Sequence, residues 1–385
     1  MKTKSLDTIL AFALVLIVAS SFAHTWQQAT TLTSAGATAM SADGRIICVV
    51  NSATHPYVST DSGKTWTLAT NSPPRGSPYV GGLAISADGS KIFATLSTNT
   101  SSRSWIFMSP DQGTNWVQTA FPSTTISTNY CVACSADGTK VIASLRNGPI
   151  FYSTNGGVNC YISSVPNAAW SSLASSADGS RMFAAANVGS GVYFSSDFGA
   201  TWTSANPLLS GCSSVCTSSD GKWVGAINNS TYISSNGGAT WRTNNLSGGI
   251  IACSADGTNW IIAGNHIYTS ADAGATWTTN LSFAQWLGGA VSADGSEMVA
   301  VGSGQGTWIG RVTPSPQLNI QSQDSNVAVS WLLPSTNFVL QQSADLTTPS
   351  WTPVSPSPTL NFTNLQQQVT VPTTGSNAFF RLIAQ

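Results

Sequence analysis

The carboxylates of this sequence are the first side chains to consider for chemistry. Two Asp or Glu residues that face one bond can hydrolyse a glycoside, one as acid and the other as nucleophile or base. The chain has 14 Asp and a single Glu, Glu297. Eleven of the Asp residues recur inside two short repeated phrases, a position that favours a structural role in turns. Glu297 also follows such a phrase, where another copy carries Lys91.

The first phrase is Ser-Ala-Asp-Gly, and it occurs seven times at intervals of 36 to 49 residues. Asp-Gly is typical of a tight turn, because Gly accepts a positive φ and Asp bonds to the local backbone. The fifth copy has Ser in place of Ala. The seven Asp residues of these turns are Asp43, Asp88, Asp137, Asp178, Asp220, Asp256 and Asp294.

The second phrase, Ser-x-Asp-x-Gly-x-Thr-Trp, follows the first along the chain. It is complete at 59–66, 195–202 and 270–277, altered at 109–116 and 234–241, and degraded at 153–160. We expect its Asp to accept hydrogen bonds from turn amides and its Trp to bury a ring between neighbouring units. The residues with these structural roles are Asp61, Trp66, Asp111, Trp116, Asp197, Trp202, Trp241, Asp272 and Trp277.

The segment around each pair of phrases predicts four short β-strands. In 81–119 these are 82–85, 91–96, 105–108 and 115–118. Repeats of this length are typical of a propeller, a solenoid or an array. Seven copies favour seven blades, although the last unit lacks its own outer strand. Residues 25–29 resemble 65–69, so we expect the N-terminal segment to supply that strand and close the ring.

Together the two phrases resemble those of the Asp-box propellers, also called bacterial neuraminidase repeat proteins. The resemblance covers roughly residues 26–313 and implies an all-β, sialidase-like, seven-bladed propeller. That group includes sialidases, some xyloglucan hydrolases, sortilin-type receptors and photosystem assembly factors. In it the second phrase is a structural turn, so the resemblance identifies a fold and leaves the function open.

The sequence predicts three functional parts and a linker. Lys2 and Lys4, the apolar run 9–19 and the small residues Ser21 and Ala23 are typical of a signal peptide over 1–23, which predicts a secreted, periplasmic or cell-surface protein. The propeller is expected over 24–312 and a Pro-rich linker over 313–316. Residues 317–385 predict a small β-sandwich, similar to fibronectin-like modules of exported bacterial proteins. Surface attachment, glycan binding and capping of the propeller remain open roles for it.

Composition excludes several classes of partner. Only 8% of the residues are charged and the net charge is −1, so nothing favours nucleic acid. Cys131 and Cys134 lack a second pair or a nearby His, and we expect neither a metal nor a cofactor. Cys212 and Cys216 are close enough in sequence to pair, which the sequence leaves undecided. No segment after the signal peptide predicts a membrane span, and we expect a monomer.

Catalysis is not favoured by the remaining residues. Sialidases carry an arginine triad and an Arg-Ile-Pro type motif, and that motif is absent here. The three His residues lie in unrelated contexts, without a nucleophile for a Ser-His-Asp mechanism. We therefore expect a non-catalytic recognition protein that binds a polysaccharide or a protein. A divergent sialidase-like glycoside hydrolase and a scaffold like the photosystem assembly factors are the alternatives.

The resemblance places both repeated turns on one rim of the propeller and the other loops on the opposite rim. That opposite rim is rich in cations and aromatic rings, which suit an anionic glycan or an acidic peptide. The alternative interpretation is that these are ordinary loop residues, with the two Trp packed between blades. The candidate ligand-binding residues are His55, Arg75, Tyr79, Arg103, Arg146, Trp170, His266 and Trp286.

Overall fold

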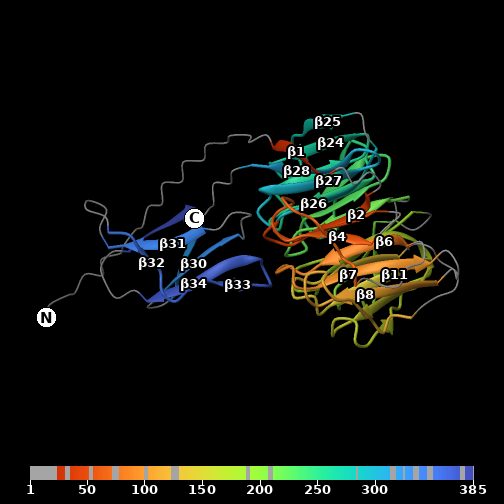
Figure 1. Cartoon of the computed structure of the whole chain (residues 1–385), viewed down its shortest axis with the longest axis horizontal. Helices are drawn as coiled ribbons and strands as arrows, with labels where there is room; N and C mark the ends of the chain where they lie inside the picture. Colours follow the sequence, from red (N-terminus) through yellow and green to blue (C-terminus); the bar gives the residue numbers. More distant parts are fainter. Residues whose placement is uncertain are drawn as a thin grey trace.

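All regular elements in the described part of the chain are β-strands, arranged in a repeat region and a smaller C-terminal module (Figure 1). The computed structural model describes residues 24–30, 35–51, 55–71, 78–98, 103–122, 130–187, 191–206, 211–282, 285–312, 318–323, 326–332, 338–344, 350–372 and 378–384. The expected signal peptide and the expected linker 313–316 lie outside these residues. No helix in the described ranges is long and apolar enough to cross a membrane.

The repeat region consists of antiparallel meanders in which each strand pairs with the next along the chain. The first meander contains β2 (Ala35–Met40), β3 (Ile47–Asn51), β4 (Pro56–Ser59) and β5 (Thr67–Leu68). The second contains β6 (Pro78–Ile85), β7 (Ile92–Thr98), β8 (Arg103–Ser109) and β9 (Val117–Gln118). The predicted four-strand unit is thus confirmed, with boundaries shifted by a few residues.

Two further meanders are joined at one point, where β11 also pairs with β14. They contain β10 (Tyr130–Cys134), β11 (Val141–Gly148), β12 (Ile150–Ser153), β13 (Tyr161–Ile162), β14 (Ala168–Ser175), β15 (Met182–Ala186), β16 (Val192–Ser195) and β17 (Thr203–Asn206). The next two contain β18 (Ser214–Thr217), β19 (Val224–Ile227), β20 (Thr231–Ser234), β21 (Arg242–Asn244), β22 (Ile250–Cys253), β23 (Trp260–Ala263), β24 (His266–Ser270) and β25 (Thr278–Ser282).

The last sheet of the repeat region combines strands from both ends of that region. It contains β26 (Trp286–Val291), β27 (Glu297–Gly302) and β28 (Gly306–Arg311), and its outer strand is β1 (Thr25–Thr30). Trp26 lies opposite Gly310, whose missing side chain leaves room for the indole ring. The predicted pairing of the N-terminal segment with this sheet is confirmed.

The seven Ser-Ala-Asp-Gly turns are connected by backbone hydrogen bonds that form a complete cycle. The Ala42 N–H donates to the Ala87 carbonyl at 2.9 Å, and the Ala293 N–H donates to the Ala42 carbonyl at 2.8 Å. Five equivalent bonds join the turns between them, through Ala136, Ala177, Ser219 and Ala255. The alanine side chains of these turns form one buried cluster, which we call the alanine ring, made of Ala42, Ala87, Ala136, Ala177, Ala255 and Ala293.

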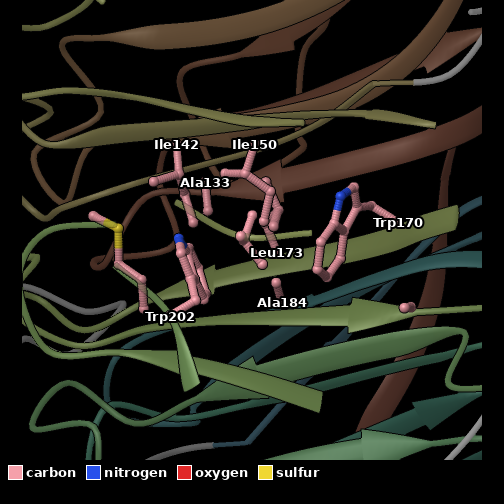
Figure 2. Close-up of a cluster of buried hydrophobic side chains, with 10 residues drawn as sticks. Ala133, Ile142, Ile150, Trp170, Leu173, Ala184 and Trp202 are labelled. Carbon is pink, nitrogen blue, oxygen red and sulfur yellow. The ribbon is translucent and has the colours of Figure 1, made fainter. Parts of the chain in front are cut away.

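Large apolar side chains fill the space between neighbouring sheets. In Figure 2, Ile142 and Ile150 of one sheet lie opposite Leu173 and Trp202 of the next. Trp66, Trp116, Trp241 and Trp277 pack in the same way against clusters shared by two sheets. Trp202 is buried in this way, and the other four indoles are partly buried in their contacts between sheets.

The C-terminal module has two sheets around one core. One sheet has the order β29 (Asn319–Gln323), β30 (Asn326–Leu332), β34 (Gln366–Pro372), β33 (Thr359–Asn361), and the other has the order β32 (Thr352–Pro353), β31 (Phe338–Ser343), β35 (Phe379–Ala384). Their shared core consists of Val329, Trp331, Leu340, Val354, Val369 and Val371. At one end of the module, Leu332 and Leu365 pack against the alanine ring. Figure 1 shows β33 and β34 on the side of the module next to the repeat region.

Candidate functional site

All seven first turns use the same network around their aspartate. In the first copy the Ser41 hydroxyl donates to Asp43 Oδ1 at 2.6 Å and accepts the Ile46 N–H at 2.9 Å, while Arg45 N–H donates to the same carboxylate oxygen. Burial of Asp88 opposes its ionisation, but hydrogen bonds from Ser86 and Ser90 outweigh burial and lower its pKa. The aspartates of the first turns therefore serve as hydrogen-bond acceptors within their own turns.

The second turns hold their aspartates as firmly. The Asp61 carboxylate accepts bonds from the Ser59 hydroxyl and from both the N–H and the hydroxyl of Thr65, at 2.6–2.8 Å. Slight burial raises its pKa, but these bonds dominate and lower it to about 2. The Trp66 Nε1–H donates to the Gly63 carbonyl at 3.1 Å. The second-turn aspartate is thus an acceptor that shapes the loop and positions the indole.

The degraded copy of the second turn keeps its hydrogen bonds without the acid. Asn155 accepts the Ser153 hydroxyl at 3.0 Å and the Asn159 N–H at 2.9 Å through its amide oxygen. Cys160 stands where the other copies have Trp, and its Sγ contacts the Ala120 carbonyl of the neighbouring sheet. A neutral amide therefore replaces the carboxylate in the turn, which argues against a chemical requirement for the acid.

Both turns of a sheet lie at the same end of that sheet. The Ser62 N–H of a second turn donates to the Arg45 carbonyl of the first turn at 3.0 Å, and Gly237 and Lys222 are joined equivalently at 2.7 Å. We call this end the turn rim. The predicted grouping of the acids follows directly, because 11 of the 12 carboxylates in the described repeat region belong to these turns.

Glu297 is the exception, and the structure shows how it is used. Its side chain is almost fully buried, and it forms an ion pair with Arg311 at 2.9 Å. The same guanidinium also donates to the Ser62 carbonyl in the first sheet. Burial raises the Glu297 pKa to about 7, opposed by the charge of Arg311. This carboxyl faces the joint between the last and first sheets and not an open cleft.

Position explains this use of Glu297. It directly follows a first turn, like Lys91 in the second copy, whose side chain reaches the Asp137 carbonyl of the next turn at 2.7 Å. A Cβ on Gly44 would lie 3.0 Å from Glu297 Oε2, so Glu297 likewise contacts the next turn of the cycle. The repeat register could have suggested this contact from sequence, although the partner Arg311 could not be identified that way.

The strand order places the candidate ligand-binding residues at the end of the sheets opposite to the turn rim. His55 precedes β4, Arg103 begins β8, His266 begins β24 and Trp286 begins β26. Tyr79 lies near the start of β6, Arg146 near the end of β11 and Trp170 near the start of β14. Arg75 lies outside the described residues. We call this end the open rim, and its residues come from separate sheets.

Two pairs of candidates are brought close together at the open rim. The Arg146 backbone pairs with Ala169, next to Trp170, and the Trp170 Nε1–H donates to the Gly148 carbonyl at 2.9 Å. The Trp286 N–H donates to the Gly264 carbonyl in the loop that leads into His266. In each pair the backbone of one sheet is bonded to that of the next, close to the two candidates.

The two indoles themselves are buried. Trp170 is 3% exposed and packs edge-on to Tyr193, with 5.5 Å between ring centroids, and Trp286 is 4% exposed. A ring covered by neighbouring side chains has no face to stack on a sugar, so packing between sheets accounts for both tryptophans. The Trp286 Nε1–H has no hydrogen-bond acceptor among the residues described. The ligand-binding role of the remaining residues stays a prediction.

The sequence predicted neither a metal site nor a cofactor, and it left the pairing of Cys212 with Cys216 undecided. Among the described residues no group of three His, Cys, Asp or Glu side chains is placed to hold a metal ion. The cysteines at 48, 131, 134, 160, 216 and 253 are free thiols. Cys212 and Cys216 belong to different core clusters, so they do not form the pair that their spacing allowed.

Solved structures similar to this chain are β-propellers. A structure described as YCF48 bound to D1 peptide has a TM-score of 0.57 and 14% identity, covering 76% of this chain and 97% of that one. A GH74 enzyme from Niastella koreensis has a TM-score of 0.59 and 13% identity, covering 80% of this chain and 59% of the enzyme. The Cps50 (Swd1) propeller domain of Myceliophteria thermophila has a TM-score of 0.56 and 12% identity, covering 75% of this chain and 100% of that domain.

These likenesses show that the chain has a β-propeller fold, and at such low identity they show the fold alone. No protein-family model matches the chain, and no curated protein matches it. The propeller neighbours include an enzyme and proteins of other kinds, so the fold leaves the function of this chain open.

Proposed function

We propose that this chain is a seven-bladed propeller of the Asp-box type, exported from the cell and closed by its N-terminal strand. The seven first turns, the cycle of backbone hydrogen bonds through them and the pairing of β1 with β28 support this architecture. In this reading each meander is one blade, and the last blade is completed by residues from both ends of the repeat region.

We further propose that the protein recognises a ligand without catalysing a reaction. The observation that carries this proposal is the use of its carboxylates. In the described repeat region 11 of them accept hydrogen bonds within their own turns, and the twelfth, Glu297, is tied to Arg311. Glycoside hydrolysis needs two carboxyls facing a substrate across a cleft, and these groups point into their own loops.

The proposed ligand is an anionic glycan or an acidic protein segment bound at the open rim. Arg103 and Arg146 begin or end strands there, and His55 and His266 lie at the same end of their sheets. Arginine binds carboxylate and sulfate groups through a planar fork of N–H donors. The neighbour described as bound to a peptide supports a peptide as one class of ligand.

A binding screen tests the proposal directly. The chain is applied to arrays of neutral and anionic polysaccharides and of acidic peptides, and the best ligand is then titrated against variants. Arg103→Ala and Arg146→Ala together should weaken binding at least tenfold, since one charge-assisted hydrogen bond contributes about 1.5–3 kcal/mol. Lys222→Ala is the matched control, because Lys222 lies on the turn rim and is paired with Asp220 at 3.0 Å.

Two results would redirect the assignment. Release of sugar from a xyloglucan or a fluorogenic sialoside would favour a glycoside hydrolase, in line with the GH74 neighbour. Retention of a membrane protein complex on the immobilised chain, with no array ligand, would favour a scaffold. Equal affinity of the double arginine variant and the Lys222 control would remove the open rim from the proposal.

A further inference from the structure

We infer that the C-terminal module is a plug that closes the central cavity of the propeller on its turn rim. The inference stands apart from the proposed ligand, because it concerns a contact between two parts of this chain. Its basis is the packing of Leu332 and Leu365 against the alanine ring and the position of Leu365 in the wall of the cavity beneath.

The cavity at the seven turns has a volume of about 160 Å³, and both apolar side chains and serines line it. Alanines of the turns line it together with Cys134, Cys253 and Leu365. A ring of small apolar side chains at the end of a propeller is an apolar surface whose exposure to water is unfavourable. Two leucines laid on that ring remove apolar area from water on both sides of the contact.

The module is built to present these two leucines together. Leu332 is the last residue of β30 and pairs in register with Gln366 of β34, the residue that follows Leu365. Both side chains are therefore at the same end of one sheet. They come from segments that the module core holds in place through Val329, Trp331, Val369 and Val371.

The backbone of Leu365 provides a second, independent observation. Its φ is +58°, in the left-handed region that large L-residues adopt rarely, and its N–H is bonded to the Asn361 carbonyl at 2.9 Å. Glycine or asparagine would suit this turn better on conformational grounds. A leucine held there is explained by what its side chain contacts, which is the alanine ring.

The neighbouring Phe362 shows that apolar character alone is not enough for this contact. It belongs to the same turn region but is 38% exposed, and it is not among the side chains packed on the alanine ring. Of the apolar side chains in this connection, the structure therefore assigns the plug to Leu365. Phe362→Asp introduces the same charge nearby and serves as the matched control.

The first measurement is small-angle scattering of the whole chain. Leu332→Asp with Leu365→Asp places two carboxylates on the alanine ring, so the module should undock and the radius of gyration should increase, while Phe362→Asp leaves it unchanged. An unchanged scattering profile for the double variant, or an equal increase for the control, overturns the inference.

The second measurement asks whether the docked module closes the cavity. Alkylation of each cysteine by N-ethylmaleimide is followed by mass spectrometry, with the fully buried Cys48 as the reference for global unfolding. Cys134 and Cys253 should react at least tenfold faster in the double variant while Cys48 stays protected. If the module undocks in the double variant but these two thiols react no faster, then the module does not close the cavity in the wild type. That result would overturn the inference.

If Cys48 also reacts in the double variant, that variant is globally unfolded. The milder variant Leu365→Ala is then used in place of the double variant. This change shortens the side chain without adding charge and leaves the core of the module intact. The same two criteria then apply: an increased radius of gyration and faster alkylation of Cys134 and Cys253 support the plug. The absence of either one refutes it.

Discussion

Glu297 and Arg311 lie opposite each other in β27 and β28 and form a buried ion pair that connects the two ends of the repeat region. The carboxylate is nearly inaccessible to solvent, and the guanidinium extends to the Ser62 carbonyl in the first sheet. Glu297 also contacts Gly44 in the first turn of the cycle. The contact between Glu297 and Arg311 therefore joins the last sheet to the first.

The raised pKa of Glu297 predicts that this joint depends on pH. The folded protein keeps the Glu297 proton up to about pH 7, whereas the unfolded chain releases it near 4.5. Between these values the folded state binds more protons, so its stability falls as pH rises, by at most about 3 kcal/mol. Melting temperatures measured from pH 5 to 8 should decline for the wild type and stay nearly constant for Glu297→Gln. Parallel profiles for the two proteins would contradict this account.

The turn aspartates predict the opposite dependence at lower pH. Hydrogen bonds lower the pKa values of Asp61, Asp197 and Asp272, that of Asp61 to about 2. Their contribution to stability is therefore complete above the unfolded value near 4 and is lost as pH falls through the folded value. Circular dichroism should show native structure retained at pH 4 and lost progressively between about pH 4 and 2. Asp61→Asn together with Asp197→Asn should flatten this acid limb, and loss of structure already at pH 5 would disagree with it.

The second-turn tryptophans are expected to carry much of the packing between sheets. Trp202 is buried among Ile142, Met182 and their neighbours, and its Nε1–H is bonded to the Gly199 carbonyl at 2.9 Å. Trp202→Ala should lower the free energy of unfolding by roughly 3–5 kcal/mol, as for other large core aromatics. Urea denaturation measures the change. Tyr161→Ala, at a residue that is 53% exposed, is the control and should have little effect.

The N-terminal strand predicts a large effect of a small deletion. Removing residues 24–30 leaves β28 as an unpaired edge and takes the Trp26 ring off Gly310. We expect a sharp drop in melting temperature, measured by calorimetry on the otherwise complete chain. Gln27→Ala, at an exposed position of the same strand, should melt like the wild type. A deleted protein that is as stable as the intact one would show that β1 does not hold the last sheet.

Local features of the fold were predictable from sequence because each repeat contains the turn residues and apolar runs that specify its own strands. Asp-Gly turns, short apolar runs and the similarity of 25–29 to 65–69 indicated strands, turns and the pairing of β1. The partner of Glu297 and the seating of Leu365 depend on residues brought together by the whole fold, so no local pattern signals them. The tryptophans of the open rim were placed correctly along the chain, but their burial depends on packing across two sheets.

The position of β1 beside β28 has a consequence for how the protein is made. The ribosome delivers β1 first and its partner only after every other strand of the repeat region has emerged. Until then the earliest strand waits without a neighbour, and the final sheet cannot assemble. Completion of the last sheet is therefore a late, long-range event in folding, and truncated chains that lack β28 cannot form it.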